Sequence, residues 1–219
     1  TYPEIGNYGV NPEDIESYQP HVSGFVVREL SPVMSSWRAR QSLDDYLKQN
    51  GIPGIEGIDT RALTKMLRVR GAMNGLISTE DISDEEAKKQ AAEWPGMVGA
   101  DYVKEVTHSA AFDWDEHDQP NEKFTLPAGT QPEPSPPELP PSDIPIVAYD
   151  FGVKYNILRC LRRYGFKVQV VPAHTTAEEV LGYKPAGVFL SSGPGDPSAL
   201  GYAIENVKVL ADHGLPIFG

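Results

Sequence analysis

A loop of glycines and prolines holds the residues most suited to chemistry. The sequence Gly-Pro-Gly-Asp-Pro at residues 193–197 directly follows an apolar run at residues 188–190. Gly193 and Gly195 lack a Cβ atom, so a ligand can approach their backbone closely, and Pro194 between them restricts the chain. Two N–H groups held in a fixed direction can bind a carboxylate or stabilise an oxyanion that forms during a reaction. A tight connection between a strand and a helix, without a ligand, explains the spacing equally well.

The same loop does not match the known phosphate-binding patterns. It has neither the G-x-x-x-x-G-K-[ST] of a P-loop nor the G-x-G-x-x-G of a dinucleotide-binding turn, whose last glycine or alanine is missing. The sequence therefore does not predict a nucleotide site at residues 193–197. Asp196 and Pro197 are expected to close the turn and start the next helix.

Three other groups of reactive residue types have simpler structural explanations. Cys160 lies in an expected helix beside its apolar stripe, with no base or helix N-terminus nearby in the sequence, so we expect a packed thiol and not a nucleophile. Helix capping and a solvated arginine explain Asp59, Thr60 and Arg61. Two histidines among the acids of residues 107–126 lack the fixed spacing of a metal site, so we expect a surface loop there.

Composition and charge limit the class of protein. The 219 residues are 40% apolar and 23% charged, which suffices for one large domain or two modest ones. A net charge of -12 without a Lys/Arg block argues against binding to nucleic acid or to an anionic membrane. No apolar run approaches the roughly 20 residues of a membrane span. The single cysteine excludes an internal disulfide and fits a reducing compartment, so we expect a cytoplasmic protein.

A proline-rich stretch divides the chain. Residues 127–145 hold eight of the twenty prolines, which cannot pair in a central strand or continue a helix. We therefore expect a first domain over residues 1–126, a linker over 127–144 and a second domain over 145–219. A polyproline ligand for a recognition domain is the less favoured interpretation of the same stretch.

Before the linker, mixed patterns predict a small α+β domain. Its expected strands and helices alternate along the chain: strands over 21–30 and 74–78, and helices over 42–51, 59–71 and 83–96. In the second of these helices, Asp59 or Thr60 is the expected N-cap and Gly71 the expected terminator.

After the linker, strands and helices alternate regularly with short connections. The expected strands are 144–152, 166–173, the start of 186–197, and 215–219, and the expected helices are 153–165, 175–185 and 199–214. This alternation is typical of an α/β fold, a doubly wound and mostly parallel sheet with helices on both faces. Ligands bind such sheets outside the carboxyl ends of the strands, so chemistry is expected in four turns: those after Asp150, Ala173, Ser192 and Gly219.

Two of these helices have more detailed predictions. The helix expected over 153–165 has an apolar stripe that should be buried, formed by Ile157, Leu158, Leu161 and Tyr164. The helix expected over 175–185 should have Thr175 or Thr176 as its N-cap, with Glu178 within reach for a capping box.

Longer motifs on both sides of the linker resemble one family. Residues 189–219, FLSSGPGDPSALGYAIENVKVLADHGLPIFG, are similar to the first half of a class I, or triad, glutamine amidotransferase domain. The segment DFGVKYNILR at residues 150–159 resembles the small, glutaminase subunit of carbamoyl phosphate synthetase, and so do TYPEIGNYG, GIDTRALTKMLRVRGAMNG and VKEVT before the linker. The resemblance spans both expected domains, except for the linker and residues 110–126.

The resemblance implies a division of labour. In that family a Cys-His-Glu triad hydrolyses glutamine, and ammonia passes through a tunnel to a large ATP-dependent subunit, which makes carbamoyl phosphate for arginine and pyrimidine synthesis. It implies that the N–H of Gly193 belongs to the oxyanion hole and that Gly195 lines the glutamine pocket. L-glutamine and the large subunit are the expected partners, ATP and Mg²⁺ are expected on that subunit, and no cofactor or metal is expected in this chain.

Both ends of the sequence look cut. There is no initiator methionine, and residues 213–219, HGLPIFG, read as a buried strand that has only started. In the family the nucleophilic cysteine comes two residues after the position of Gly219, and the His and Glu follow later. We therefore expect no catalytic residue within these 219 residues, and no glutamine hydrolysis by them alone.

Two other functions remain open. An amidotransferase-like domain without catalysis could serve for docking on a synthetase, and the residue at the cysteine position after Gly219 decides between this function and the enzyme. A flavodoxin-like phosphate or nucleotide binder is the third interpretation, and the motifs before the linker argue against it.

Overall fold

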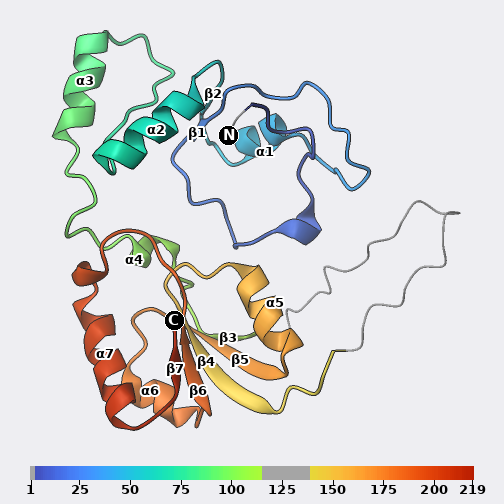
Figure 1. The fold of residues 1–219 in the computed structure, drawn as a ribbon, viewed down its shortest axis with the longest axis vertical. Coiled ribbons are helices and arrows are strands. Elements are labelled where there is room, and N and C mark those ends of the chain that lie inside the picture. Colours follow the sequence, from blue (N-terminus) through green and yellow to red (C-terminus); the bar gives the residue numbers. More distant parts are fainter. Residues whose placement is uncertain (1–2, 115–138) are drawn as a thin grey trace, which may run out of the picture. The chain divides into compact units, whose positions relative to one another are not determined.

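The computed structural model describes residues 3–114 and 139–219, which form two compact units, Thr1–Gly96 and Met97–Gly219 (Figure 1). Residues 97–114, assigned from the sequence to the first domain, belong to the second unit, where Val103 and Trp114 are buried. The predicted linker at 127–144 falls largely outside the described residues, so the predicted domain boundaries stay a prediction.

The first unit contains short elements. They are a 3-10 helix η1 (Pro12–Asp14), strands β1 (Phe25–Val26) and β2 (Gly54–Ile55), and helices α1 (Leu43–Gln49), α2 (Thr60–Arg70) and α3 (Asp84–Glu93). All three predicted helices are confirmed. Each has the side chain of its N-cap accepting a backbone N–H in the first turn, as capping predicts: Ser42 from Asp45, Asp59 from Ala62, and Ser83 from Glu86.

Both strand predictions in this unit are largely wrong. Within residues 21–30 the two residues of β1 pair in parallel with β2 and Leu30 forms an isolated bridge with Ile5, and residues 74–78 contain no strand. A ladder extends only as far as a partner strand runs beside it, and β2 offers two residues. Apolar alternation at 21–30 therefore did not suffice for a long strand.

The second unit is built around a five-stranded sheet of order β3-β5-β4-β6-β7. Its strands are β3 (Phe112–Asp113), β4 (Ile144–Asp150), β5 (Phe166–Pro172), β6 (Gly187–Leu190) and β7 (Ile217–Phe218). All neighbouring pairs are parallel except β3 with β5. The mostly parallel sheet predicted from the sequence is therefore confirmed, with β3 as an unpredicted antiparallel edge.

Helices cover both faces of this sheet, as a doubly wound fold requires (Figure 1). Helix α5 (Tyr155–Arg163) packs through Leu158 on one face, against side chains of β4 and β5. Helices α6 (Ala177–Gly182) and α7 (Gly201–Asp212) pack through Val180 and Leu210 on the other face. A one-turn helix α4 (Val103–Val106) and the 3-10 helix η3 (Pro197–Ala199) complete the unit.

Three details of the helix predictions are wrong. Tyr164 is 80% exposed, since it is the C-cap and follows the last residue of α5, whereas Leu158 is fully buried. Cys160 is exposed, so it is not a packed thiol. The capping box of α6 pairs Thr176 with Glu179, since the box joins the N-cap to the third helical residue; Glu178 stands one position earlier.

Candidate functional site

The connections that carry the predicted site diverge at the carboxyl ends of β4 and β6. These strands are parallel neighbours, while the chain leaves β4 for β5 on the other side of it. Such a switch in strand order opens a crevice where ligands of α/β sheets bind. The turn after Asp150 and the loop at 191–197 therefore lie side by side at the edge where the sequence predicted chemistry.

Gly193 lies directly on the turn after β4. A Cβ atom added to Gly193 would overlap the carbonyl oxygen of Phe151 and lie 2.9 Å from its Cβ. Only glycine permits this approach of the two backbones. Phe151 is tied to the same loop from its other side, because its N–H donates to Ser191 Oγ at 2.9 Å.

Gly195 faces a different neighbour. It has a φ of +86°, a conformation that favours glycine, and a Cβ added there would lie 3.2 Å from the Tyr102 ring and 3.5 Å from the Ala100 carbonyl oxygen. No described residue accepts a hydrogen bond from the N–H of Gly193 or Gly195. Both amides are thus available to a ligand, and their roles in an oxyanion hole and a glutamine pocket stay predictions.

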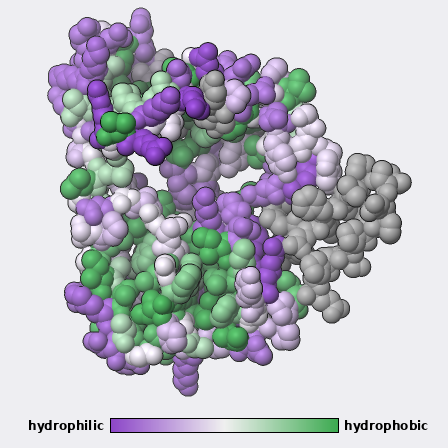
Figure 2. All heavy atoms as spheres, in the orientation of Figure 1, coloured by the Kyte–Doolittle hydropathy of each residue, from purple (hydrophilic) through white to green (hydrophobic). Residues whose placement is uncertain are grey.

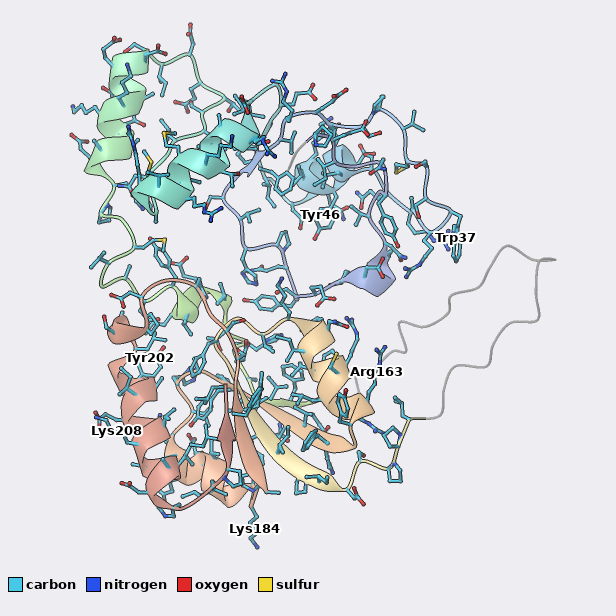
Figure 3. All side chains as sticks on the ribbon, in the orientation of Figure 1. Trp37, Tyr46, Arg163, Lys184, Tyr202 and Lys208 are labelled. Atoms are coloured by element: carbon cyan, nitrogen blue, oxygen red, sulfur yellow. The ribbon has the colours of Figure 1, made fainter. Side chains whose placement is uncertain are left out.

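A cavity of about 380 Å³ borders Gly193 but not Gly195. Its walls are mainly apolar and include Phe151, Leu190 and Pro194, and α7 closes one side, with Lys208 among the lining residues. Figure 3 shows Tyr202 and Lys208 projecting from this helix. Leu190 also contacts the last residue of the chain, since its Cβ would lie 3.0 Å from a Cβ on Gly219. The Gly193 side of the loop therefore lies next to the end of β7.

The surface around this site is apolar. Figure 2 shows apolar side chains gathering over α7 and strands β6 and β7 of the second unit. On these elements Ile204 and Val209 of α7 are 41% and 43% exposed, and Phe218 of β7 is 74% exposed.

A buried carboxylate holds the turn under Gly193. Asp150 is 1% exposed, and its Oδ1 accepts the N–H groups of Gly152 and Val153 at 2.9 and 2.8 Å. Its Oδ2 accepts the backbone N–H of His108 at 2.7 Å and contacts His108 Nδ1 at 2.6 Å. Burial is the largest influence and raises the pKa of Asp150, but these hydrogen bonds together hold that pKa below its usual value.

Sequence reasoning missed His108. Residues 107–126 were predicted to be a surface loop, yet residues 107–114 include β3 and place His108 beside Asp150; residues 115–126 lie outside the described part of the chain. The pair is separated by 42 residues, so no local spacing could reveal it. The one available signal was Asp150 itself, a carboxylate at the end of a buried strand.

The described residues hold neither a metal cluster nor a membrane-spanning helix. Across 3–114 and 139–219, no three His, Cys, Asp or Glu side chains gather as they would around a metal ion. None of the helices in those ranges has the length and apolarity to cross a lipid bilayer.

Comparison with known proteins gives matches over both units. Residues 1–77 match the family model for the carbamoyl-phosphate synthase small chain, CPSase domain, and residues 147–219 match that for the class-I glutamine amidotransferase. The chain is 49% identical over 219 residues to the carbamoyl phosphate synthase small chain of Syntrophotalea carbinolica, and 50% identical over 219 and 220 residues to those of Nostoc sp. and Vibrio parahaemolyticus. Each alignment covers all of this chain but only 55%, 54% and 56% of these relatives. The chain thus spans about half the length of the curated relatives it matches.

Proposed function

The chain belongs to the carbamoyl phosphate synthase small-chain family, and from this premise we propose that the full-length protein hydrolyses glutamine to glutamate and ammonia. The observation that carries the proposal is the succession of two family matches in one chain, a small-chain domain at 1–77 and an amidotransferase domain at 147–219. An amidotransferase domain alone would not identify the synthetase that uses the ammonia, whereas the two matches together point to carbamoyl phosphate synthase.

Within this proposal the loop at 193–197 supplies electrostatic stabilisation. Attack of a cysteine thiolate on the side-chain amide of glutamine produces a tetrahedral oxyanion, and N–H donors that are already aimed at it lower the barrier. We assign the Gly193 N–H as one such donor, since Gly193 borders the cavity and its N–H has no acceptor among the described residues. Gly195 contributes to the glutamine pocket, and the triad Cys, His and Glu lie beyond Gly219.

The ammonia is consumed by a partner. We assign its use to a large synthetase subunit that forms a heterodimer with this protein and holds the ATP and Mg²⁺, making carbamoyl phosphate for arginine and pyrimidine biosynthesis in the cytoplasm. The net charge of -12 supports a protein partner over a nucleic acid or an anionic membrane.

The test is glutamine hydrolysis by the full-length protein with its large subunit. We expect glutamate release and glutamine-dependent carbamoyl phosphate synthesis, and a protein that supports synthesis only from added ammonia would be the non-catalytic docking module instead. Residues 1–219 alone are expected to release no ammonia. Release that persists after Cys160→Ser would contradict this expectation, because Cys160 is the only cysteine present.

A further inference from the structure

We propose that Asp150 is a positioning residue for glutamine hydrolysis, which acts through the turn at 151–152 that supports Gly193, and that His108 fixes Asp150. This inference rests on the proposed function for its chemistry. Its structural part, that the pair holds the loop in place, can be tested separately.

The first step is the rigidity of the carboxylate. Asp150 accepts four hydrogen bonds, two from the following turn and two from His108. A carboxylate that is 1% exposed and bonded at both oxygens has little freedom to move. Its position therefore fixes the N–H groups of Gly152 and Val153.

The second step leads from this turn to Gly193. The carbonyl of Phe151 lies so close under Gly193 that no side chain fits between them. A Cβ atom on Gly152 would lie 3.4 Å from Cδ of Pro194, so a second residue of the turn also touches the loop. A shift of the turn would displace Gly193 and redirect its N–H. Displacements of about 1 Å in an active site can cost on the order of 100-fold in rate.

The third step is the role of His108. A buried carboxylate with lowered pKa only accepts hydrogen bonds, so Nδ1 of His108 must carry the hydrogen at the 2.6 Å contact. Its Nε2 lies 3.2 Å from the Tyr155 hydroxyl of α5, and its ring packs on Phe112 with centroids 4.8 Å apart. These contacts set the ring orientation, so the segment at 107–114 fixes the carboxylate from outside the strand.

The experiment compares two variants of the full-length protein. His108→Leu removes the side-chain donor and keeps an apolar group against Phe112, whereas His108→Asn places an amide N–H near the position of Nδ1. We expect His108→Leu to lower kcat for glutamine hydrolysis about ten-fold or more, with KM changed by less than about three-fold, and His108→Asn to restore most of kcat. His213→Asn is the matched control, since His213 is an exposed residue at the end of α7.

Amide hydrogen exchange gives a readout that does not depend on activity. His108→Leu should accelerate exchange in peptides covering 151–153 and 191–195, and the His213 control should not. Unchanged exchange or unchanged kcat would overturn the proposal, and so would equal losses in both His108 variants. If the unmodified protein released no ammonia, the proposed function would fail and with it the catalytic role, while faster exchange would still establish that His108 and Asp150 hold the loop.

Discussion

The same kinds of sequence pattern predicted the strands and helices of both units, yet the observed elements agree closely with the prediction in only one of them. In Met97–Gly219 the strands β4 and β5 each reach seven residues, whereas β1 and β2 in Thr1–Gly96 reach two. Val27 is the only buried apolar side chain among the described residues of the first unit, and the second unit has an extensive core. Pattern predicts structure well where neighbouring segments bury one another.

The physical reason lies in the packing of the helix that connects two paired strands. In the second unit β4 pairs with β5 across α5, and Leu158 of that helix packs against side chains of both strands. In the first unit β1 pairs with β2 across α1, but the pairing stops after two residues and α1 has no buried residue. In the first unit, therefore, few contacts between segments reinforce the preference of each segment for a strand or a helix.

The first expected outcome compares a crowded glycine with an open one. Gly193→Ala should lower kcat for glutamine hydrolysis about 100-fold or more, because its Cβ would overlap the Phe151 carbonyl and displace an oxyanion donor. Gly75→Ala in the first unit is the control, since a Cβ there meets nothing within 4 Å. Glutamate formation from glutamine measures both, and synthesis from added ammonia should be unchanged. A Gly193→Ala enzyme with normal kcat would remove Gly193 from the site.

The second outcome compares buried with exposed leucines. Leu210→Ala on α7 should lower the free energy of unfolding by about 2–5 kcal/mol, because it leaves a cavity under a fully buried side chain. Leu67→Ala on α2, at a side chain 37% exposed, should cost less than about 1 kcal/mol. Urea denaturation of the full-length variants checks both. Similar losses would show that the first unit has a core of comparable strength.

Much of the second unit could be predicted from its sequence, and the reasons are local. The β-branched run at 144–150 and the apolar stripe with Leu158 each determine a strand or a helix by themselves. The orientation of Gly195 toward Tyr102 and the contact of His108 with Asp150 could not be predicted, since each joins segments distant in sequence. The loop at 193–197 was recognised from its composition, while the turn that supports it required the structure.

The third outcome concerns how the stability of the fold depends on pH. Hydrogen bonds hold the pKa of Asp150 below its ordinary value of 3.8, although burial opposes them. As pH falls, Asp150 is therefore protonated in the unfolded chain before it is protonated in the folded one. The stability that its carboxylate contributes is fully present above about pH 4 and is lost as pH falls through its lower pKa in the folded state. Asp150→Asn should make the unfolding midpoint in urea depend less on pH below about pH 4. An unchanged dependence would show that the carboxylate is not stabilised in the folded state.

The fourth outcome compares the N-cap residue of one helix in each unit. Thr176 on α6 and Ser83 on α3 both accept an N–H from the third helical residue, at 3.2 Å in each case. Substitution of either by alanine removes about 1 kcal/mol from its own helix. Helix α6 buries Ala177 and Val180, so Thr176→Ala should lower the unfolding midpoint of the whole unit.

Helix α3 buries no residue, so the same loss should remain within it. Ser83→Ala is expected to accelerate amide hydrogen exchange over residues 84–93 and to leave the urea midpoint unchanged, because a helix without packed side chains opens independently of the rest. A midpoint lowered as much as by Thr176→Ala would mean that α3 unfolds together with a core. The comparison therefore separates helices that exist through packing from helices that exist through their own caps and charges.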